Sequence, residues 1–181
     1  MTDISDLYPA TVHHFKDSLA VSHAADKLPL WEAVYRKAWP DFAGMVCHRQ
    51  DGQHQRDGID RSVTLVNGVQ ILIDEKIRKV DYGDILLEYM SNNVYKTAGW
   101  VCKTGLRCHY IAYAIEPAEV CYLLPVRELQ AAWRENGDQW ISQYGVKKAF
   151  NPGYHSLNCP VPVDALFTGM TGAMTINWGA E

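Results

Sequence analysis

The dipeptide Asn67-Gly68, set between two apolar runs, constrains the fold more than any other part of this chain. The runs at 59–66 and 69–78 are rich in β-branched residues and alternate apolar with polar side chains, which is typical of strands that bury one face. Asn-Gly favours a tight hairpin turn because both residues tolerate positive φ angles. The sequence therefore predicts an antiparallel hairpin over residues 59–78.

The register of this hairpin decides which side chains share a face. In a plain two-residue turn Asp60 would face Glu75, and Asp74 would lie on the other side of the sheet. A three-residue connection with Gly68 in the left-handed conformation, or a β-bulge, shifts the pairing by one residue. Only the shifted register buries the apolar residues of both strands together, namely Val63, Leu65, Ile71 and Ile73. We favour it, and it groups Asp60 and Asp74 with Lys76.

That polar face carries a chemically specific set of groups. Residues two apart on a strand share a face, so Asp74 and Lys76 point the same way, with Asp60 opposite them. Carboxylate oxygens are the ligands that Mg²⁺ prefers, and a nearby ammonium group can act on the attacking water or on developing negative charge. The grouping predicts a divalent-metal site suited to phosphodiester hydrolysis.

Glu75 is the difficult member of this hairpin. The favoured register turns its side chain toward the apolar face, where an unpaired carboxylate is expensive to bury. Four solutions remain open: a cation such as Arg78, a helix N-terminus, an exposed strand end, or a metal ion for which Glu75 is itself a ligand.

The rest of the chain predicts further elements around the hairpin. Apolar spacing and turn residues predict a helix at 28–39, strands at 42–48, 85–90, 110–115 and 120–124, a helix from 125 to 136 with a turn or two added at 139–144, and a short helix at 163–168. Residues 49–57 read as a polar loop, 147–162 as irregular, and 169–181 as a loose tail. We predict one domain over 1–181, with its core at about 28–136. The expected fold is α+β or mixed α/β, with a central mixed, mostly antiparallel sheet flanked by helices.

Composition describes a globular protein whose centre is less acidic than its flanks. The 181 residues are 48% hydrophobic and 21% charged, with a net charge of −4, which is ordinary for a soluble domain. Residues 49–107 contain nine Lys or Arg and eight Asp or Glu. If several of these acids bind metal ions, this region is where we expect a phosphate backbone to lie.

Several classes of protein are disfavoured. The first ten residues lack the parts of a signal peptide, and no apolar run approaches the roughly 20 residues of a membrane helix, so we expect a cytoplasmic protein without a membrane partner. The five cysteines lack CxxC spacing, which indicates reduced thiols rather than disulfides or a zinc ribbon. Nucleotide-binding P-loop and GxGxxG motifs and the GxSxG motif of serine hydrolases are absent from the sequence.

The helix, the hairpin and its charged residues together resemble the PD-(D/E)xK nuclease superfamily, which includes many type II restriction endonucleases and Holliday-junction resolvases. The resemblance covers roughly residues 28–90 and 120–136. In that family a helix precedes the sheet, a first acid lies on one strand, and a (D/E)-x-K triplet lies on the next. Asp60 matches the first acid, Asp74 the second and Lys76 the lysine.

Two positions depart from the family pattern. Gly58-Ile59 precedes the first acid where the family name has proline, and Glu75 occupies the middle of the triplet, where an apolar residue is usual. The first departure occurs in divergent members. The second puts the choice of the second metal ligand in question.

The resemblance implies a restriction-endonuclease-like fold and a Mg²⁺-dependent endonuclease that hydrolyses DNA, with Mn²⁺ able to substitute. Asp60 and Asp74 would hold one or two metal ions, with the carbonyl of Glu75 and waters completing the shell, and Lys76 would orient the attacking water or stabilise the transition state. DNA is the expected partner. Restriction-like enzymes are often dimers, so a homodimer is also expected.

Three further residues are secondary candidates. Glu32 lies on the expected first helix, where many family members carry an acid; Gln55 could contact DNA or position Asp60; and Glu88 could be a third acid on a neighbouring strand. The alternative for the whole chain is a non-catalytic module of the same fold that binds DNA or protein and has a regulatory role. In that case the carboxylates only look like an active site.

Overall fold

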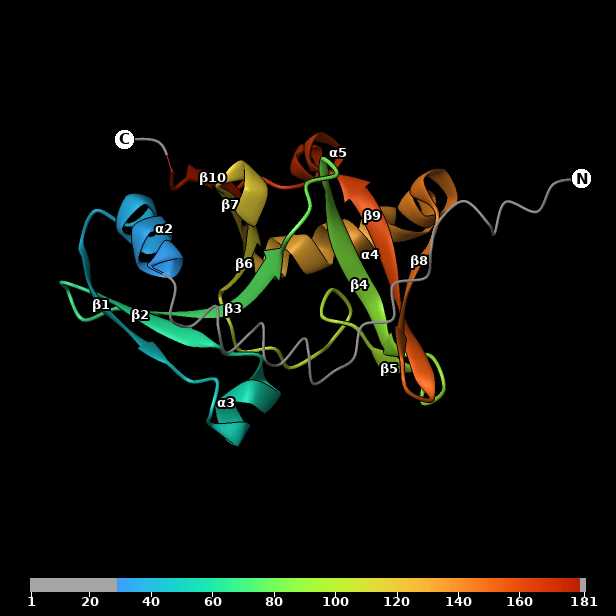
Figure 1. Cartoon of the computed structure of the whole chain (residues 1–181), viewed down its shortest axis with the longest axis horizontal. Helices are drawn as coiled ribbons and strands as arrows, with labels where there is room; N and C mark the ends of the chain where they lie inside the picture. The colour runs from blue at the N-terminus through green and yellow to red at the C-terminus, as the bar shows by residue number, and fades with distance from the viewer. Residues whose placement is uncertain (1–28, 180–181) are drawn as a thin grey trace, which may run out of the picture.

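Residues 29–179, which the computed structural model describes, form an α+β fold with two β-sheets and four α-helices (Figure 1). The six-stranded sheet has the spatial order β1 (Phe42–Cys47), β2 (Arg61–Leu65), β3 (Gln70–Arg78), β6 (Tyr110–Ile115), β7 (Val120–Pro125) and β10 (Met174–Asn177). The four-stranded sheet has the order β5 (Thr97–Ala98), β4 (Asp84–Asn92), β9 (Tyr154–Pro162) and β8 (Lys147–Asn151). The helices are α2 (Leu30–Ala38), α3 (Gly52–Asp57), α4 (Val126–Tyr144) and α5 (Val163–Thr168), with a 3₁₀ turn, η2 (Glu116–Ala118), before β7.

The β2–β3 hairpin adopts the shifted register. Arg61 pairs with Ile73, and Val63 with Ile71. The connection has three residues, and its last residue, Gly68, has a φ of 83°. A left-handed backbone of this kind costs little for glycine because it has no Cβ. The predicted register is therefore confirmed.

The six-stranded sheet is mixed, since β3 and β6 run parallel while its other neighbouring strands run antiparallel. Each face of this sheet is covered. The helix α2 covers one face through Trp31, Val34 and Tyr35, and the small side chains of Ala112 and Ala114 on β6 lie beneath it in the same cluster.

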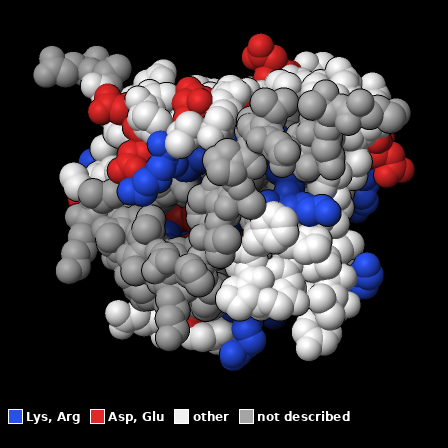
Figure 2. Space-filling model, turned by 45° about the vertical axis from the view of Figure 1, so that its right-hand side comes forward, with Lys and Arg blue, Asp and Glu red and all other residues white. Residues whose placement is uncertain are grey.

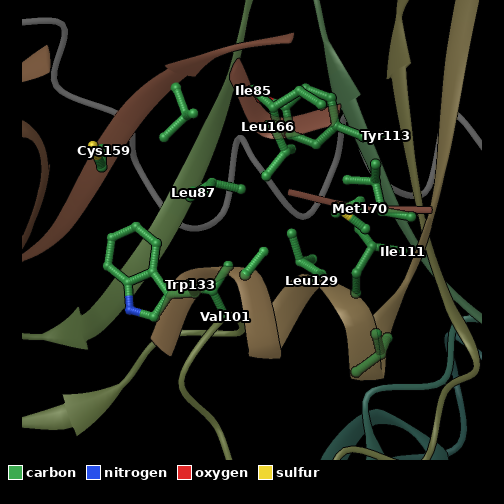
Figure 3. Close-up of a cluster of buried hydrophobic side chains, with 14 of the residues drawn as sticks. Ile85, Leu87, Val101, Ile111, Tyr113, Leu129, Trp133, Cys159, Leu166 and Met170 are labelled. Carbon is green, nitrogen blue, oxygen red and sulfur yellow. The ribbon is translucent and has the colours of Figure 1, made fainter. Parts of the chain in front are cut away.

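The other face packs against α4 and the second sheet. Figure 3 shows side chains of β4, β6, α4 and α5 converging on this core, among them Leu87, Ile111, Leu129, Trp133 and Leu166. Strand β6 alternates between the two cores: Ile111, Tyr113 and Ile115 belong to the α4 side, whereas its alanines belong to the α2 side. This period of two is what a strand buried on both faces requires.

Most of the predicted helices and strands are confirmed to within a residue or two, but the polar loop predicted at 49–57 is wrong because it contains α3. Asp51 caps this helix, and its Oδ1 accepts hydrogen bonds from the amides of Gln53 (2.8 Å) and His54 (3.3 Å). A six-residue helix is too short to show helical periodicity in its apolar residues.

The irregular segment predicted at 147–162 is also wrong, because it forms β8 and β9. Strand β9 contains Pro160 and Pro162, and because proline is rare inside sheets its sequence does not indicate a strand. Strand β8 pairs only with Tyr154–Asn158, so both prolines lie where β9 has a single neighbouring strand. The single central sheet that we expected is therefore accompanied by a second sheet.

Two predicted ends are corrected as well. The helix expected to stop at 136–137 continues through Gly137 to Tyr144. A Cβ at residue 137 would lie 3.0 Å from the Trp133 ring, so glycine allows this ring to pack closely against the helix backbone. The tail predicted as loose contains β10, which pairs with β7.

Residues 1–28 and 180–181 lie outside the described residues. No helix between residues 29 and 179 has the length and apolarity needed to cross a bilayer.

We predict that Leu129→Ala destabilises the protein by about 3 kcal/mol, because Leu129 is 1% exposed in the core between the two sheets and the truncation leaves a cavity. Val46→Ala is the control, since Val46 is 56% exposed, and it should change stability by less than about 0.5 kcal/mol. Urea unfolding of both variants checks this. Equal losses would contradict the proposed core.

Candidate functional site

Asp60, Asp74 and Lys76 lie together on the polar face of the hairpin. Asp60 directly precedes β2, and its amide donates to the carbonyl oxygen of Ile73 at 2.9 Å. By continuation of the strand pairing, Asp60 lies opposite Asp74. The Nζ atom of Lys76 is 2.6 Å from Oδ1 of Asp74. The structure therefore brings together the three residues that the sequence grouped.

The approach of the chain to Asp60 depends on Gly58. This residue ends α3 with a φ of 71°, and a Cβ there would lie 2.4 Å from a methyl carbon of Leu106. Ile59 is then buried, and Asp60 begins the pairing with β3. A larger residue at 58 would require both an unfavourable backbone and a shift of Leu106, so glycine at this place helps to position the first acid.

The site is sheltered but open to solvent. The side chains of Asp60, Asp74 and Lys76 are 16%, 9% and 34% exposed. Part of each side chain therefore reaches the molecular surface, while most of it is shielded from water. Electrostatic interactions are stronger in such a setting than on an open surface.

Burial and charge shift the protonation equilibria of the group. Burial raises the pKa of Asp74 to about 6; Lys76 opposes this shift and Asp60 adds to it. Burial alone would lower the pKa of Lys76, but Asp74 and Asp60 together raise it above its ordinary value. Asp60, Asp74 and Lys76 therefore interact electrostatically as one group, and burial makes the ionised form of Asp74 costly unless a cation accompanies it.

The second sheet contributes Glu88. This residue lies on β4, opposite Asn158 of β9, and is partly buried. Burial raises the pKa of its carboxyl, while the charge of Lys76 and a hydrogen bond from Ser156 oppose that shift. Glu88 is thus near enough to interact electrostatically with Lys76. Of the three secondary candidates, it is the one that the structure brings toward the site.

Glu75 lies on the opposite face of β3, where its carboxylate has no exposure to solvent. Its Oε1 accepts from the hydroxyl of Tyr35 (2.7 Å) and from Nε of Arg61 (2.6 Å), and its Oε2 accepts from Nη2 of Arg49 (2.9 Å). Of the solutions open to Glu75, pairing with a cation is the one observed. Its side chain points to the opposite face from that of Asp74, so the Glu75 carboxylate is not placed to share a metal ion with Asp74.

Glu75 still affects the site through its backbone. Its amide donates to Oδ2 of Asp60 at 2.9 Å, and Nη2 of Arg49 lies 3.7 Å from the same oxygen. The Asp60 carboxylate is therefore held both by the backbone of β3 and by a side chain from the loop before α3. Such contacts restrict its rotation and prepare one orientation for a ligand.

The remaining predicted residues lie elsewhere. Arg78, which we considered as the partner of Glu75, pairs instead with Asp84 at the start of β4. Glu32 is exposed on α2, where it binds Arg36 one helical turn away. Gln55 lies in α3, and its side-chain amide donates to the carbonyl oxygen of Arg49 at 3.0 Å, so it supports the loop that carries Arg49.

Sequence reasoning missed the Arg49–Arg61–Tyr35 cluster around Glu75. Arg61 could have been found, because it has the same strand parity as Val63 and therefore shares the buried face with Glu75. Tyr35 also belongs to the apolar stripe of its helix. No local signal identifies Arg49, which comes from a loop, and none identifies Ser156, because its strand was not predicted.

The residues present suit Mg²⁺ better than a metal that requires a full set of protein ligands. Within residues 29–179, no group of three or more His, Cys, Asp or Glu side chains is arranged to hold a metal ion. Asp60 and Asp74 provide a pair of carboxylates only. Mg²⁺ usually keeps several waters and binds one or two carboxylates together with substrate phosphates. A site with two partly exposed carboxylates fits this mode of binding.

Charges of both signs occupy the face of the molecule seen in Figure 2. Lys and Arg side chains are interspersed there with Asp and Glu, and on this face they do not form one continuous basic surface. Any contact with a nucleic-acid backbone on this side would therefore involve separate basic groups.

We predict that Glu75→Gln destabilises the protein by about 3 kcal/mol, because it leaves two buried guanidinium groups without a full counter-charge. Glu32→Gln is the matched control, since its ion pair is exposed and should contribute less than about 1 kcal/mol. Urea unfolding at neutral pH measures both. A loss for Glu75→Gln no larger than for Glu32→Gln would show that the cluster is not structurally important.

The raised pKa of Asp74 predicts a specific pH dependence. The folded protein binds the proton more tightly than the unfolded chain, whose Asp titrates near 4, so wild type should lose stability as the pH rises from about 4 to about 6. Asp74→Asn lacks this loss. The difference in free energy of unfolding between the two proteins should therefore change by about 2 kcal/mol across this window, and Lys76 does not contribute because it titrates far above it. A constant difference from pH 4 to 7 would refute the raised pKa.

No family model, curated protein or solved structure matches this chain. No relative therefore assigns a role to Asp60, Asp74 or Lys76. Their roles have to be inferred from the chemistry of the side chains and from their positions.

Proposed function

We propose that this chain is a Mg²⁺-dependent deoxyribonuclease that hydrolyses phosphodiester bonds at Asp60, Asp74 and Lys76. The resemblance to the PD-(D/E)xK superfamily suggests the reaction, and the geometry of the hairpin supports it. One observation carries the proposal: Asp60 and Asp74 lie opposite each other while Nζ of Lys76 lies 2.6 Å from Asp74, all on the same face.

In this proposal the two carboxylates hold the metal ion. When bound, Mg²⁺ supplies a water of lowered pKa and neutralises charge on the scissile phosphate. Asp60 is already oriented by the amide of Glu75 and by Arg49. Asp74 binds a cation in its ionised form, and its raised pKa means that a bound cation and a proton compete for it.

Lys76 is the group that would act on the reacting phosphate. Its ammonium is paired with Asp74, is 34% exposed, and keeps its proton at neutral pH because the acids raise its pKa. A fixed positive charge at this place stabilises negative charge that develops on phosphate oxygens in the transition state. Glu88 also interacts electrostatically with Lys76 and favours its charged form.

The alternative is a non-catalytic DNA- or protein-binding module of the same fold. One observation favours it: Lys76 already neutralises Asp74, and no third metal-binding side chain joins the pair within the described residues. In this case the Asp74–Lys76 pair is an ordinary ion pair at the edge of a core. Metal binding separates the two functions without requiring a known substrate.

We predict that wild-type protein binds Mn²⁺ in a calorimetric titration and that Asp60→Ala and Asp74→Asn do not, because each removes one of only two carboxylate ligands. Lys76→Gln should still bind Mn²⁺ but lose Mg²⁺-dependent cleavage of plasmid and oligonucleotide DNA by about 100-fold or more, since its charge acts mainly on the transition state.

Asp164→Asn is the matched control for these titrations. It makes the same chemical change at an exposed position on α5 and should bind Mn²⁺ as wild type does. Circular dichroism confirms that each variant is folded. Absence of heat in the wild-type titration would favour the non-catalytic alternative, and full cleavage activity in Asp74→Asn would eliminate the proposed site.

A further inference from the structure

The charges of this chain are segregated along its sequence. Residues 89–115 and 139–163 contain no Asp or Glu, so all 21 acidic residues lie outside these two segments. The same segments contain five basic residues, which are Lys96, Lys103, Arg107, Lys147 and Lys148. In a protein with a net charge of −4, this is a local reversal of sign.

The two segments meet at one end of the second sheet. The amide of Asn93 donates to the carbonyl oxygen of His155 at 3.0 Å, and the amide of His155 donates to Oδ1 of Asn93 at 2.8 Å. Phe150 pairs with His155 across β8 and β9, and their ring centroids are 5.7 Å apart. We call this end, residues 93–96 and 147–155, the sheet tip; it lies at the lower right of Figure 1.

Large apolar side chains of the sheet tip are exposed. Tyr95 is 81% exposed, Val94 56% and Phe150 40%. Lys96 follows Tyr95 along the chain, Lys148 precedes Phe150 by two residues on β8, and both lysines are exposed. Figure 2 brings this side of the molecule forward and shows a largely uncharged area at the lower right with Lys and Arg side chains at its edges. Exposed aromatic rings with basic residues and without acids are the composition of a surface that binds single-stranded nucleic acid.

We propose that the sheet tip binds a single-stranded stretch of DNA. The rings of Tyr95 and Phe150 stack on bases, and the ammonium groups of Lys96 and Lys148 contact phosphates. Single-stranded DNA fits better than duplex DNA because base faces are available for stacking only when the bases are unstacked from each other. Neither segment contributes a carboxylate that would repel a phosphate backbone.

The position of the sheet tip connects it to the candidate active site. Strand β4 carries Glu88 near Lys76 and runs on to Asn92, just before the loop of Tyr95. At about 3.3 Å per residue, Tyr95 lies at most roughly 23 Å from Glu88 along the chain. That the bound strand is the substrate rests on the proposed nuclease function. Binding itself does not, since it needs no metal ion.

The lysines of β8 have a second explanation. Strand β8 is at the edge of its sheet, and lysines on edge strands prevent pairing with another copy of the chain. This explanation predicts self-association when the lysines are neutralised and no effect on DNA. It does not account for the exposed rings.

The test is fluorescence anisotropy with a labelled 20-nucleotide thymidine strand and the whole 181-residue chain in EDTA, which prevents cleavage. Wild type should bind this strand more tightly than a duplex of the same length. Tyr95→Ala and Phe150→Ala should each weaken binding about fivefold or more. Lys148→Gln should reduce the slope of log affinity against log salt by about 0.7.

Tyr82→Ala is the matched control, because Tyr82 is 67% exposed at the other end of β4, and it should bind as wild type does. The proposal is overturned if wild type binds neither strand form, if the duplex binds as tightly, or if both ring variants bind normally. Self-association of Lys148→Gln with unchanged DNA affinity would assign the lysines to edge protection instead. Because EDTA is present, these outcomes are independent of whether the Mn²⁺ titrations support the nuclease.

Discussion

The neutralisation of the buried Glu75 carboxylate is the interaction on which the rest of this structure depends. Tyr35 reaches it from α2, Arg61 from β2, and Arg49 from the loop before α3, so one carboxylate joins three separate segments to the centre of the sheet. The backbone of the same residue orients Asp60. Fold and candidate site are therefore coupled at one position: the side chain of Glu75 stabilises one face of β3, and its amide organises the other.

The local pattern of the sequence was sufficient for the hairpin and for the grouping on its polar face. Val63 and Ile71 share the buried face only in the register with a three-residue turn, and that register also sets Asp60 opposite Asp74. The left-handed Gly68 supplies the extra residue of the turn. These features depend on contacts between residues within about twenty positions of each other along the chain. Such contacts can be predicted from the alternation of apolar and polar side chains.

Contacts between segments far apart in the sequence could not be predicted in this way. Arg49 neutralises Glu75 from a loop whose sequence is merely polar, and Arg78, which is nearer along the chain, binds Asp84 instead. The second sheet was missed because β9 contains prolines at positions that only its incomplete pairing with β8 makes acceptable. Glu88 approaches Lys76 only because that sheet exists. Identifying these contacts requires the three-dimensional arrangement.

The parallel pairing of β3 with β6 has a consequence for how the chain can be assembled. Between these neighbours the chain leaves the first sheet to form β4 and β5, and after β7 it leaves again for β8 and β9 before returning with β10. Each sheet is thus interleaved with the other, and no single cut would separate them into two folding units. Pairings between such distant segments form slowly. During synthesis, β4 lacks its neighbour β9 until residues 154–162 emerge, and β7 lacks its neighbour β10 until residues 174–177 emerge. Until then these strand edges are open to pairing with the wrong partner.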